Sequence, residues 1–228
     1  MKRWKFWGKE GLQELGIILG IALLMALFTG VRGSGWMGDS LASRAECVMS
    51  LYPWYVMLAG GLLMAMSVIG CFLVYLPAML SVNCTRKEAF RGMVGMRLCL
   101  ICAMLALAAI VWNVLGNDIA VSGRKLLVAA AGGLLAANAA GSFFACIIAL
   151  CGRGGIAAAA GGLFGGGLGI GFYMGISGGF GKLADQIAYG MEHQKLLFHG
   201  VSLGTGAGLF LLMLFWEAKI IGKMEARL

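Results

Sequence analysis

Long uncharged stretches constrain the fold of this chain more than any other feature. Six of them can be read directly from the sequence. They are Leu15 to Val31, Pro53 to Leu76, Leu98 to Gly116, Leu126 to Cys151, Gly155 to Gly181 and Phe198 to Trp216. At about 1.5 Å per residue in a helix, each reaches or nearly reaches the roughly 30 Å of a bilayer core. Because these runs do not alternate polar and apolar residues as barrel strands do, they predict helices.

Composition excludes a soluble fold. Apolar residues make up 61% of the chain, a further 38 residues are glycine, and only 12% are charged. Globular domains carry about 25% charged residues. The sequence therefore predicts an all-α, polytopic membrane protein, in which residues 1–228 form one transmembrane domain of six helices.

The basic residues are distributed unevenly between the loops on the two predicted sides of the membrane. With the N-terminus placed inside, twelve Lys and Arg residues fall on the cytoplasmic side and six on the other, whereas the acids divide five and five. The cytoplasmic set is Lys2, Arg3, Lys5, Lys9, Arg86, Lys87, Arg91, Arg97, Arg153, Lys219, Lys223 and Arg227. This bias predicts that both termini are cytoplasmic. The net charge of +8 is then largely a topology signal, and nucleic acid is not expected as a partner.

Residues 1–14 mix aromatic and charged side chains, as in Trp4, Phe6, Trp7 and Glu10. Such a segment suits an amphipathic helix that lies at the inner membrane interface before the first span. A basic anchor with an aromatic belt would have the same composition. Both interpretations stay open at this point.

No set of residues indicates an enzyme. The glycines before Lys182 resemble the end of a P-loop, but Ile176 stands where the first glycine should be and Leu183 replaces the magnesium-binding Ser or Thr. His193 and His199 are spaced six apart and do not share a helical face. We therefore expect no catalytic residue, no metal site and no cofactor site in this chain.

Glycine is concentrated in the fifth predicted span, where thirteen of the 28 residues from Gly154 to Gly181 are glycine. Several recur at intervals of four along the helix. The candidate helix-packing residues are Gly161, Gly165, Gly167, Gly171, Gly175 and Gly179. Such a row predicts a groove into which another backbone packs closely. Tight static packing and a moving transport interface both account for it.

Asn138 is the one amide near the middle of the fourth span, and small residues surround it. Because lipid cannot satisfy an amide, its side chain should face protein or a cavity. We treat Asn138 as a candidate pathway or interhelical polar residue.

The loop of residues 81–92, between the second and third spans, carries the clearest functional signal. Thr85 can cap a helix and Glu88 follows three residues later, as in a capping box, while Phe90 adds an apolar contact beside a basic face. This pattern predicts a compact cytoplasmic docking helix. Its candidate contact residues are Thr85, Arg86, Lys87, Glu88, Phe90 and Arg91.

The pattern Leu-Pro-Ala-Met-Leu-Ser, followed by Thr85 to Phe90, resembles the first cytoplasmic loop of small six-span permease subunits of bacterial ABC exporters, the type-2 or ABCG-like class. Asn83-Cys84 stands where that family often has glycine. The resemblance implies a location in the bacterial plasma membrane and docking of this loop on a separate ATP-binding subunit, which would hold ATP and magnesium. It also implies a second permease chain, identical or different, and an external segment over residues 182–197.

The function expected from this resemblance is that of the membrane subunit of an ATP-driven exporter, whose substrate is hydrophobic, peptide or lipid-like. Two alternatives stay open. An ion-coupled secondary transporter would need polar groups in mid-membrane, and only Asn113 and Asn138 were candidates in the predicted spans. A membrane scaffold or immunity protein would use the glycine groove to hold a partner helix.

Overall fold

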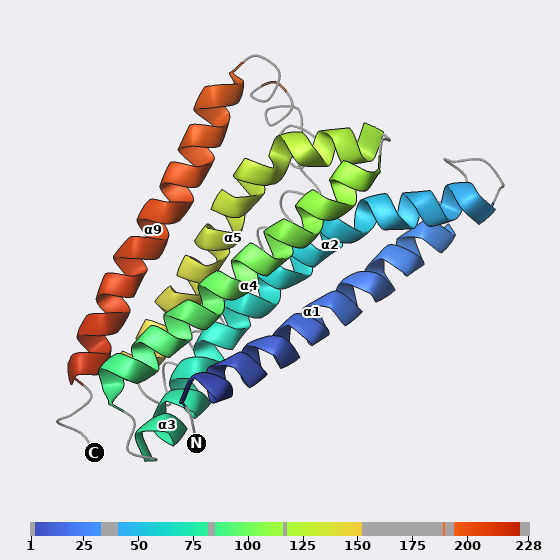
Figure 1. Cartoon of the computed structure of the whole chain (residues 1–228). Coiled ribbons are helices and arrows are strands. Elements are labelled where there is room, and N and C mark those ends of the chain that lie inside the picture. Colours follow the sequence, from blue (N-terminus) through green and yellow to red (C-terminus); the bar gives the residue numbers. More distant parts are fainter. Residues whose placement is uncertain are drawn as a thin grey trace.

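The computed structural model describes residues 3–32, 41–81, 85–115, 118–151, 189 and 194–223, and nearly all of them are helical. In chain order the elements are α1 (Arg3–Arg32), α2 (Leu41–Gly70), a π-helical segment (Cys71–Tyr75), α3 (Leu76–Ser81), α4 (Arg86–Val114), α5 (Asp118–Cys151) and α9 (Lys195–Lys223). For this part of the chain, the prediction of an all-α fold is confirmed (Figure 1).

Five of the described helices, namely α1, α2, α4, α5 and α9, are long and apolar enough to cross a membrane. The chain is therefore a multi-pass membrane protein. Each of the five overlaps one predicted span. The remaining predicted span, Gly155 to Gly181, lies outside the described residues, as does most of the predicted external segment. Residues 195–197 of that segment are instead the first residues of α9.

The first helix is longer than its predicted span. α1 runs without interruption from Arg3 to Arg32, so residues 3–14 form no separate helix. The side chain of Trp7 is only 4% exposed, and its ring occupies the space that a Cβ atom would fill at Gly92 of α4. This packing of an aromatic ring against α4 holds the first turns of α1 in the bundle.

The second helix also begins earlier than expected, at Leu41, and contains the buried Pro53. Proline inside a helix removes one backbone hydrogen bond and bends the helix. Figure 1 shows α2 bending in its N-terminal part.

A π-helical segment, Cys71–Tyr75, connects α2 directly to α3. The backbone N–H of Leu76 donates to the carbonyl of Cys71, five residues earlier. The next residue, Pro77, has no N–H to donate, so a regular α-helical bond cannot form there. Such π-helical turns are rare and occur frequently at functional sites.

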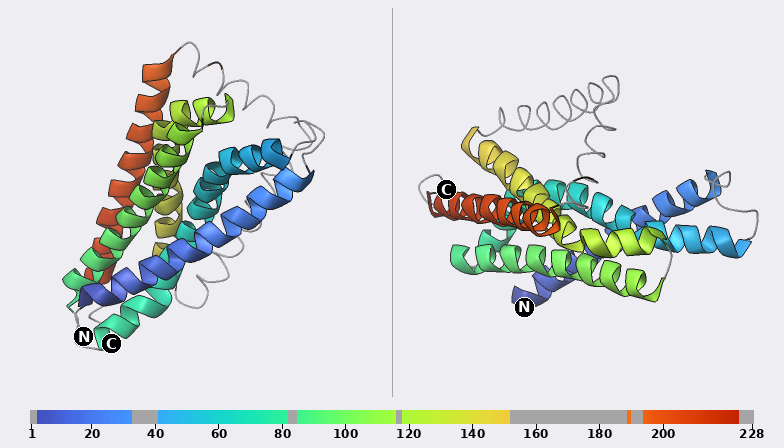
Figure 2. Two further views of the ribbon diagram at one scale, coloured as in Figure 1. Left: turned by 45° about the vertical axis from the view of Figure 1, so that its right-hand side comes forward. Right: turned by 90° about the horizontal axis from the view of Figure 1, so that it is seen from above.

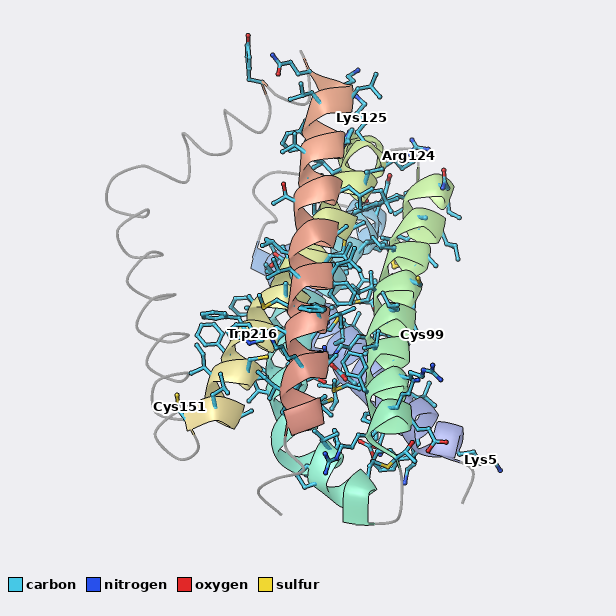
Figure 3. The ribbon with its side chains drawn as sticks, turned by 90° about the vertical axis from the view of Figure 1, so that its left-hand side faces the viewer. Lys5, Cys99, Arg124, Lys125, Cys151 and Trp216 are labelled. Carbon is cyan, nitrogen blue, oxygen red and sulfur yellow. The ribbon has the colours of Figure 1, made fainter. Side chains whose placement is uncertain are left out.

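The helices form an elongated bundle with two distinct ends (Figures 1 and 2). We call the end that holds the start of α1, α3, the start of α4 and the end of α9 the basal end. α5 and α9 run in the same direction, because Ser202 contacts Ala129 near one end and Trp216 contacts Phe143 nearer the other. Figure 3 places Lys5 and Cys151 towards the basal end, and Arg124 and Lys125 at the opposite end.

Apolar side chains from α1, α2, the π-helical segment, α3, α4, α5 and α9 build the core, and six methionines, two tryptophans and four alanines are among them. Trp112 is fully buried, and its indole N–H donates to the carbonyl of Ser50 at 3.1 Å. Many large apolar side chains face outwards instead, such as Leu62, Val114 and Phe215, which are 65, 80 and 72% exposed. An apolar outer surface of this extent is what lipid contact requires, since lipid replaces water around the spans.

Candidate functional site

The start of α4 has the predicted capping box. The backbone N–H of Glu88 donates to Thr85 Oγ1 at 3.4 Å, and the Glu88 carboxylate accepts from the Thr85 backbone N–H at 3.3 Å. The Thr85 hydroxyl also donates to the same carboxylate at 2.8 Å. The capping box satisfies N–H groups that have no partner within the helix, so α4 starts firmly at Arg86.

The predicted docking helix is not a separate short helix, because α4 continues from Arg86 to Val114. Its first turns have two faces. Ala89 is fully buried, and Phe90 is half-buried against the core, so the aromatic ring anchors the helix rather than offering itself to a partner. Lys87 and Arg91 are exposed, together with Thr85 and Glu88, and Arg86 is half-buried. The surface available to a partner is therefore polar and basic.

A buried ion pair joins α4 to α9. Arg97 Nη1 donates to both carboxylate oxygens of Glu217, at 3.0 and 3.1 Å, and contacts Ser142 Oγ on α5 at 3.4 Å. Arg97 is 2% exposed and Glu217 is fully buried. The expectation that Arg97 belongs to a cytoplasmic loop was wrong. It lies eleven residues inside α4, which is about 16 Å from the start of the helix.

The two charges can be buried in a stable fold because each neutralises the other. A buried charge without a partner costs several kcal/mol, whereas a hydrogen-bonded pair offsets most of that cost. Arg97 Nε and Nη2 are nevertheless buried without a hydrogen-bond partner. Unsatisfied buried donors of this kind need an explanation, and they mark this level of the bundle as a candidate functional region.

Two further carboxylates lie near the basal end, where α1 faces α2. Ser67 Oγ donates to Glu14 Oε2 and the Tyr75 hydroxyl donates to Glu10 Oε2, each at 2.8 Å. Edge-on contacts with Phe6 and Trp7 hold the Tyr75 ring in place.

These two carboxylates line the polar end of a groove between α1 on one side and α2 with the π-helical segment on the other, with a volume of about 840 Å³. Gln13, Ser67 and Tyr75 complete its polar part. Its remaining walls are apolar or glycine: Gly16, Ile17, Leu63, Met66, Gly70 and Val74. We call this space the α1–α2 groove.

Asn138 is fully buried in α5, as its position in an apolar span required. Neither its Nδ2 nor its Oδ1 has a hydrogen-bond partner. It lies four residues before Ser142, on the same face of α5, so it precedes the Arg97 contact by about one helical turn.

Among the described helices, three glycines of α5 and α9 lie at close backbone contacts. The row from Gly161 to Gly179 lies outside the described residues. A Cβ atom at Gly132 of α5 would overlap the backbone of Ser202 in α9, one at Gly206 would overlap the backbone of Gly132, and one at Gly141 would overlap the backbone of Ala65 in α2. Small residues thus bring α5 into backbone contact with α9 and with α2.

Sequence reasoning missed Arg97, Ser142 and Glu217 as a cluster, and Glu10 and Glu14 as the lining of a groove. The one available signal was position, because Arg97 and Glu217 directly flank the predicted spans that begin at Leu98 and end at Trp216. Within the described ranges, no three His, Cys, Asp or Glu side chains come together as metal ligands would.

The position of Cys151 gives a test of topology. It is an exposed free thiol at the end of α5, towards the basal end (Figure 3). If the basal end is cytoplasmic, a variant with Cys151 as its single cysteine should react with a membrane-impermeant maleimide in inverted vesicles and not in intact cells. Cys47 lies between the first and second predicted spans, which is the external side if the N-terminus is inside, so a variant with Cys47 alone should show the opposite. Labelling of Cys151 from outside would contradict the predicted orientation.

No protein-family model, no curated protein and no solved structure matches this chain.

Proposed function

We propose that this chain is the transmembrane permease subunit of an ATP-driven ABC transporter, and that ATP is hydrolysed on a separate subunit that docks at the start of α4. The observation that carries the proposal is the capped, exposed basic surface around Lys87 and Arg91 at the basal end. The family resemblance of the surrounding loop points to the same function. In this scheme the permease performs no chemistry, and ATP and magnesium remain on the partner.

The continuity of α4 supports a mechanical role for this surface. Its 29 residues extend for about 42 Å, from the capped start to the opposite end of the bundle. Because Phe90, Arg97 and Trp112 lie on the same rigid helix, a displacement at its start moves the contacts of Arg97 with α5 and α9 as well. A partner that changes shape on binding ATP could therefore bias two arrangements of the bundle through α4.

The directions of α5 and α9 support the six-span arrangement of this class. α5 ends towards the basal end at Cys151, whereas α9 begins at the opposite end (Figures 1 and 3). The chain between them therefore has to join opposite ends of the bundle. The predicted span from Gly155 to Gly181 lies in this part of the sequence. We assign it as the sixth crossing, and a second permease chain, identical or different, would complete the transport pathway.

The docking role is tested by reversing exposed charges. In a complex purified through a tag on this chain, the partner should be an ATP-binding subunit identified by mass spectrometry. The double variant Lys87→Glu and Arg91→Glu should lower the amount of that subunit and the ATP hydrolysis of the complex by about tenfold, because each lost charge contact is worth up to about 1 kcal/mol at an exposed site.

The matched control is Arg124→Glu with Lys125→Glu, two exposed basic residues at the opposite end of the bundle (Figure 3). This control should leave the complex intact. Equal losses in both double variants, or a wild-type complex without any ATP-binding subunit, would rule the proposal out.

An ion-coupled secondary transporter is the second candidate, and one structural observation now favours it. The spans contain a buried Arg97–Glu217 pair and the carboxylate of Glu14, whereas only two asparagines were evident from the sequence. Charged groups within spans often belong to ion pathways. Transport that collapses with an ionophore and continues after ATP depletion would identify this mechanism in place of the first.

A further inference from the structure

We propose that the α1–α2 groove binds an amphipathic organic cation, that is, a molecule with an ammonium or guanidinium group attached to an apolar body. That this ligand is the transported substrate rests on the function proposed above, whereas its binding to the groove does not. The proposal follows from the shape of the groove, the charge at its polar end and the hydrogen-bonding state of Glu14.

The groove is large enough for a small organic molecule and has two chemically different parts. Its volume of about 840 Å³ lies within the range of roughly 300–1,000 Å³ found for ligand pockets. Ile17, Leu63, Met66 and Val74 provide an apolar wall. Nothing lies within 4 Å of a Cβ atom built on Gly16 or Gly70, so these glycines leave open space. The apolar body of a ligand would lie along this wall.

The polar part of the groove carries negative charge and no positive charge of its own. Glu10 and Glu14 line it, and no lysine or arginine is among its described lining residues. Lys5 and Lys9 are exposed on α1 and do not line it. Ser67 donates one hydrogen bond to Glu14 and Tyr75 donates one to Glu10, but neither brings a charge. The charge of a cationic ligand complements this end of the groove.

The carboxylate of Glu14 still lacks a donor. Its Oε2 accepts from Ser67, whereas its Oε1 is buried without a hydrogen-bond partner. Arg97 is close enough for its charge to act on Glu14, but its Nη1 is engaged by both oxygens of Glu217, and no hydrogen bond joins Arg97 to Glu14. An ammonium or guanidinium group can donate to a free carboxylate oxygen, and charge-assisted bonds of this type are the stronger ones.

The experiment uses the full chain in nanodiscs of zwitterionic lipid, with dansylcadaverine as the probe. This molecule carries a primary ammonium on an alkyl chain and a fluorophore that brightens in apolar surroundings. We expect saturable binding above the signal of empty nanodiscs. The N-acetylated probe, which has lost its charge, should bind at least about tenfold more weakly, since a hydrogen bond to a charged group contributes about 1.5–3 kcal/mol.

Two variants locate the site. Glu14→Gln keeps an acceptor for Ser67 but removes the charge, and it should raise the Kd of dansylcadaverine about tenfold. Gly16→Leu fills the groove and should abolish saturable binding. Because nothing lies within 4 Å of the added Cβ atom, this variant should still fold.

Each variant has a matched control that lies outside the groove. Glu46→Gln removes an exposed carboxylate on α2, and Gly20→Leu adds the same bulk one turn along α1 at another open glycine. Both controls should keep the wild-type Kd. The proposal is overturned by equal binding of the two probes, by non-saturable binding only, or by Glu14→Gln and Gly16→Leu variants that bind like the wild type. The binding experiment uses this chain without an ATP-binding subunit. A negative result in it would therefore leave the docking test of the proposed function unaffected.

Discussion

Glu217→Leu is expected to destabilise the protein more than any other single substitution that we consider. The change leaves the guanidinium of Arg97 buried and without its ion-pair partner, because both carboxylate oxygens that it contacts at 3.0 and 3.1 Å are lost. Breaking a buried pair in this way costs about 3–5 kcal/mol. The melting temperature of the purified protein should fall by on the order of 10 °C. Fluorescence-detected gel filtration after heating measures this change.

The double variant Arg97→Met with Glu217→Leu is the informative control. It removes both charges and fills their space with apolar side chains, so no charge is left buried without a partner. Replacement of a buried pair by apolar residues is often neutral or stabilising. We therefore expect the double variant to regain most or all of the lost stability. If it is as unstable as Glu217→Leu, the loss arises from packing around α9 and the ion-pair explanation is wrong.

Gly132→Ala should destabilise the contact between α5 and α9, although it adds only one methyl group. The new Cβ atom would overlap the carbonyl of Ser202, and the helices would have to separate. Ser202 also donates to the carbonyl of Ala129 at 3.1 Å, and separation would strain this bond. Overpacking of this type costs about 1–3 kcal/mol. The same heating experiment should show a melting temperature several degrees below that of the wild type.

The neighbouring Gly133 provides the control. Nothing lies within 4 Å of a Cβ atom at this position, so Gly133→Ala meets open space. Alanine is also a better helix former than glycine, by about 1 kcal/mol in a helix interior. Gly133→Ala should therefore be neutral or slightly stabilising. A second pair, Gly206→Ala against Gly204→Ala, repeats the comparison on α9. Equal effects within each pair would show that α5 and α9 do not pack as closely as described.

Single charges explain why the predicted spans were too short. Several predicted spans were ended at the charged residue that flanks them. For three of the span ends this residue is Glu14, Arg97 or Glu217, and each of them lies inside a longer helix. In the folded bundle, Arg97 and Glu217 neutralise each other, while Ser67 donates to Glu14. Each charged residue that signals a helix boundary in the sequence is, in the structure, hydrogen-bonded to a residue on another helix.

Some features of the candidate site were also predictable from the sequence, whereas others were not. The capping box at Thr85 and Glu88 was predictable, because its two residues are three apart and its geometry depends only on the local backbone. The burial of Asn138 was predictable from the cost of an amide in lipid. In contrast, the inward position of Phe90 depends on the neighbouring helices, so the sequence left it as a candidate contact residue for a partner.

Composition by itself determined that this chain is helical and lies in a membrane. Apolar runs of sufficient length leave few alternatives, because lipid cannot satisfy a free backbone group. Tertiary structure decided which polar groups meet. Arg97 and Glu217 are 120 residues apart, and Glu10 meets Tyr75 across 65 residues. Such pairs depend on how the helices are aligned and rotated against one another, and these quantities are not encoded by the local composition of any one helix.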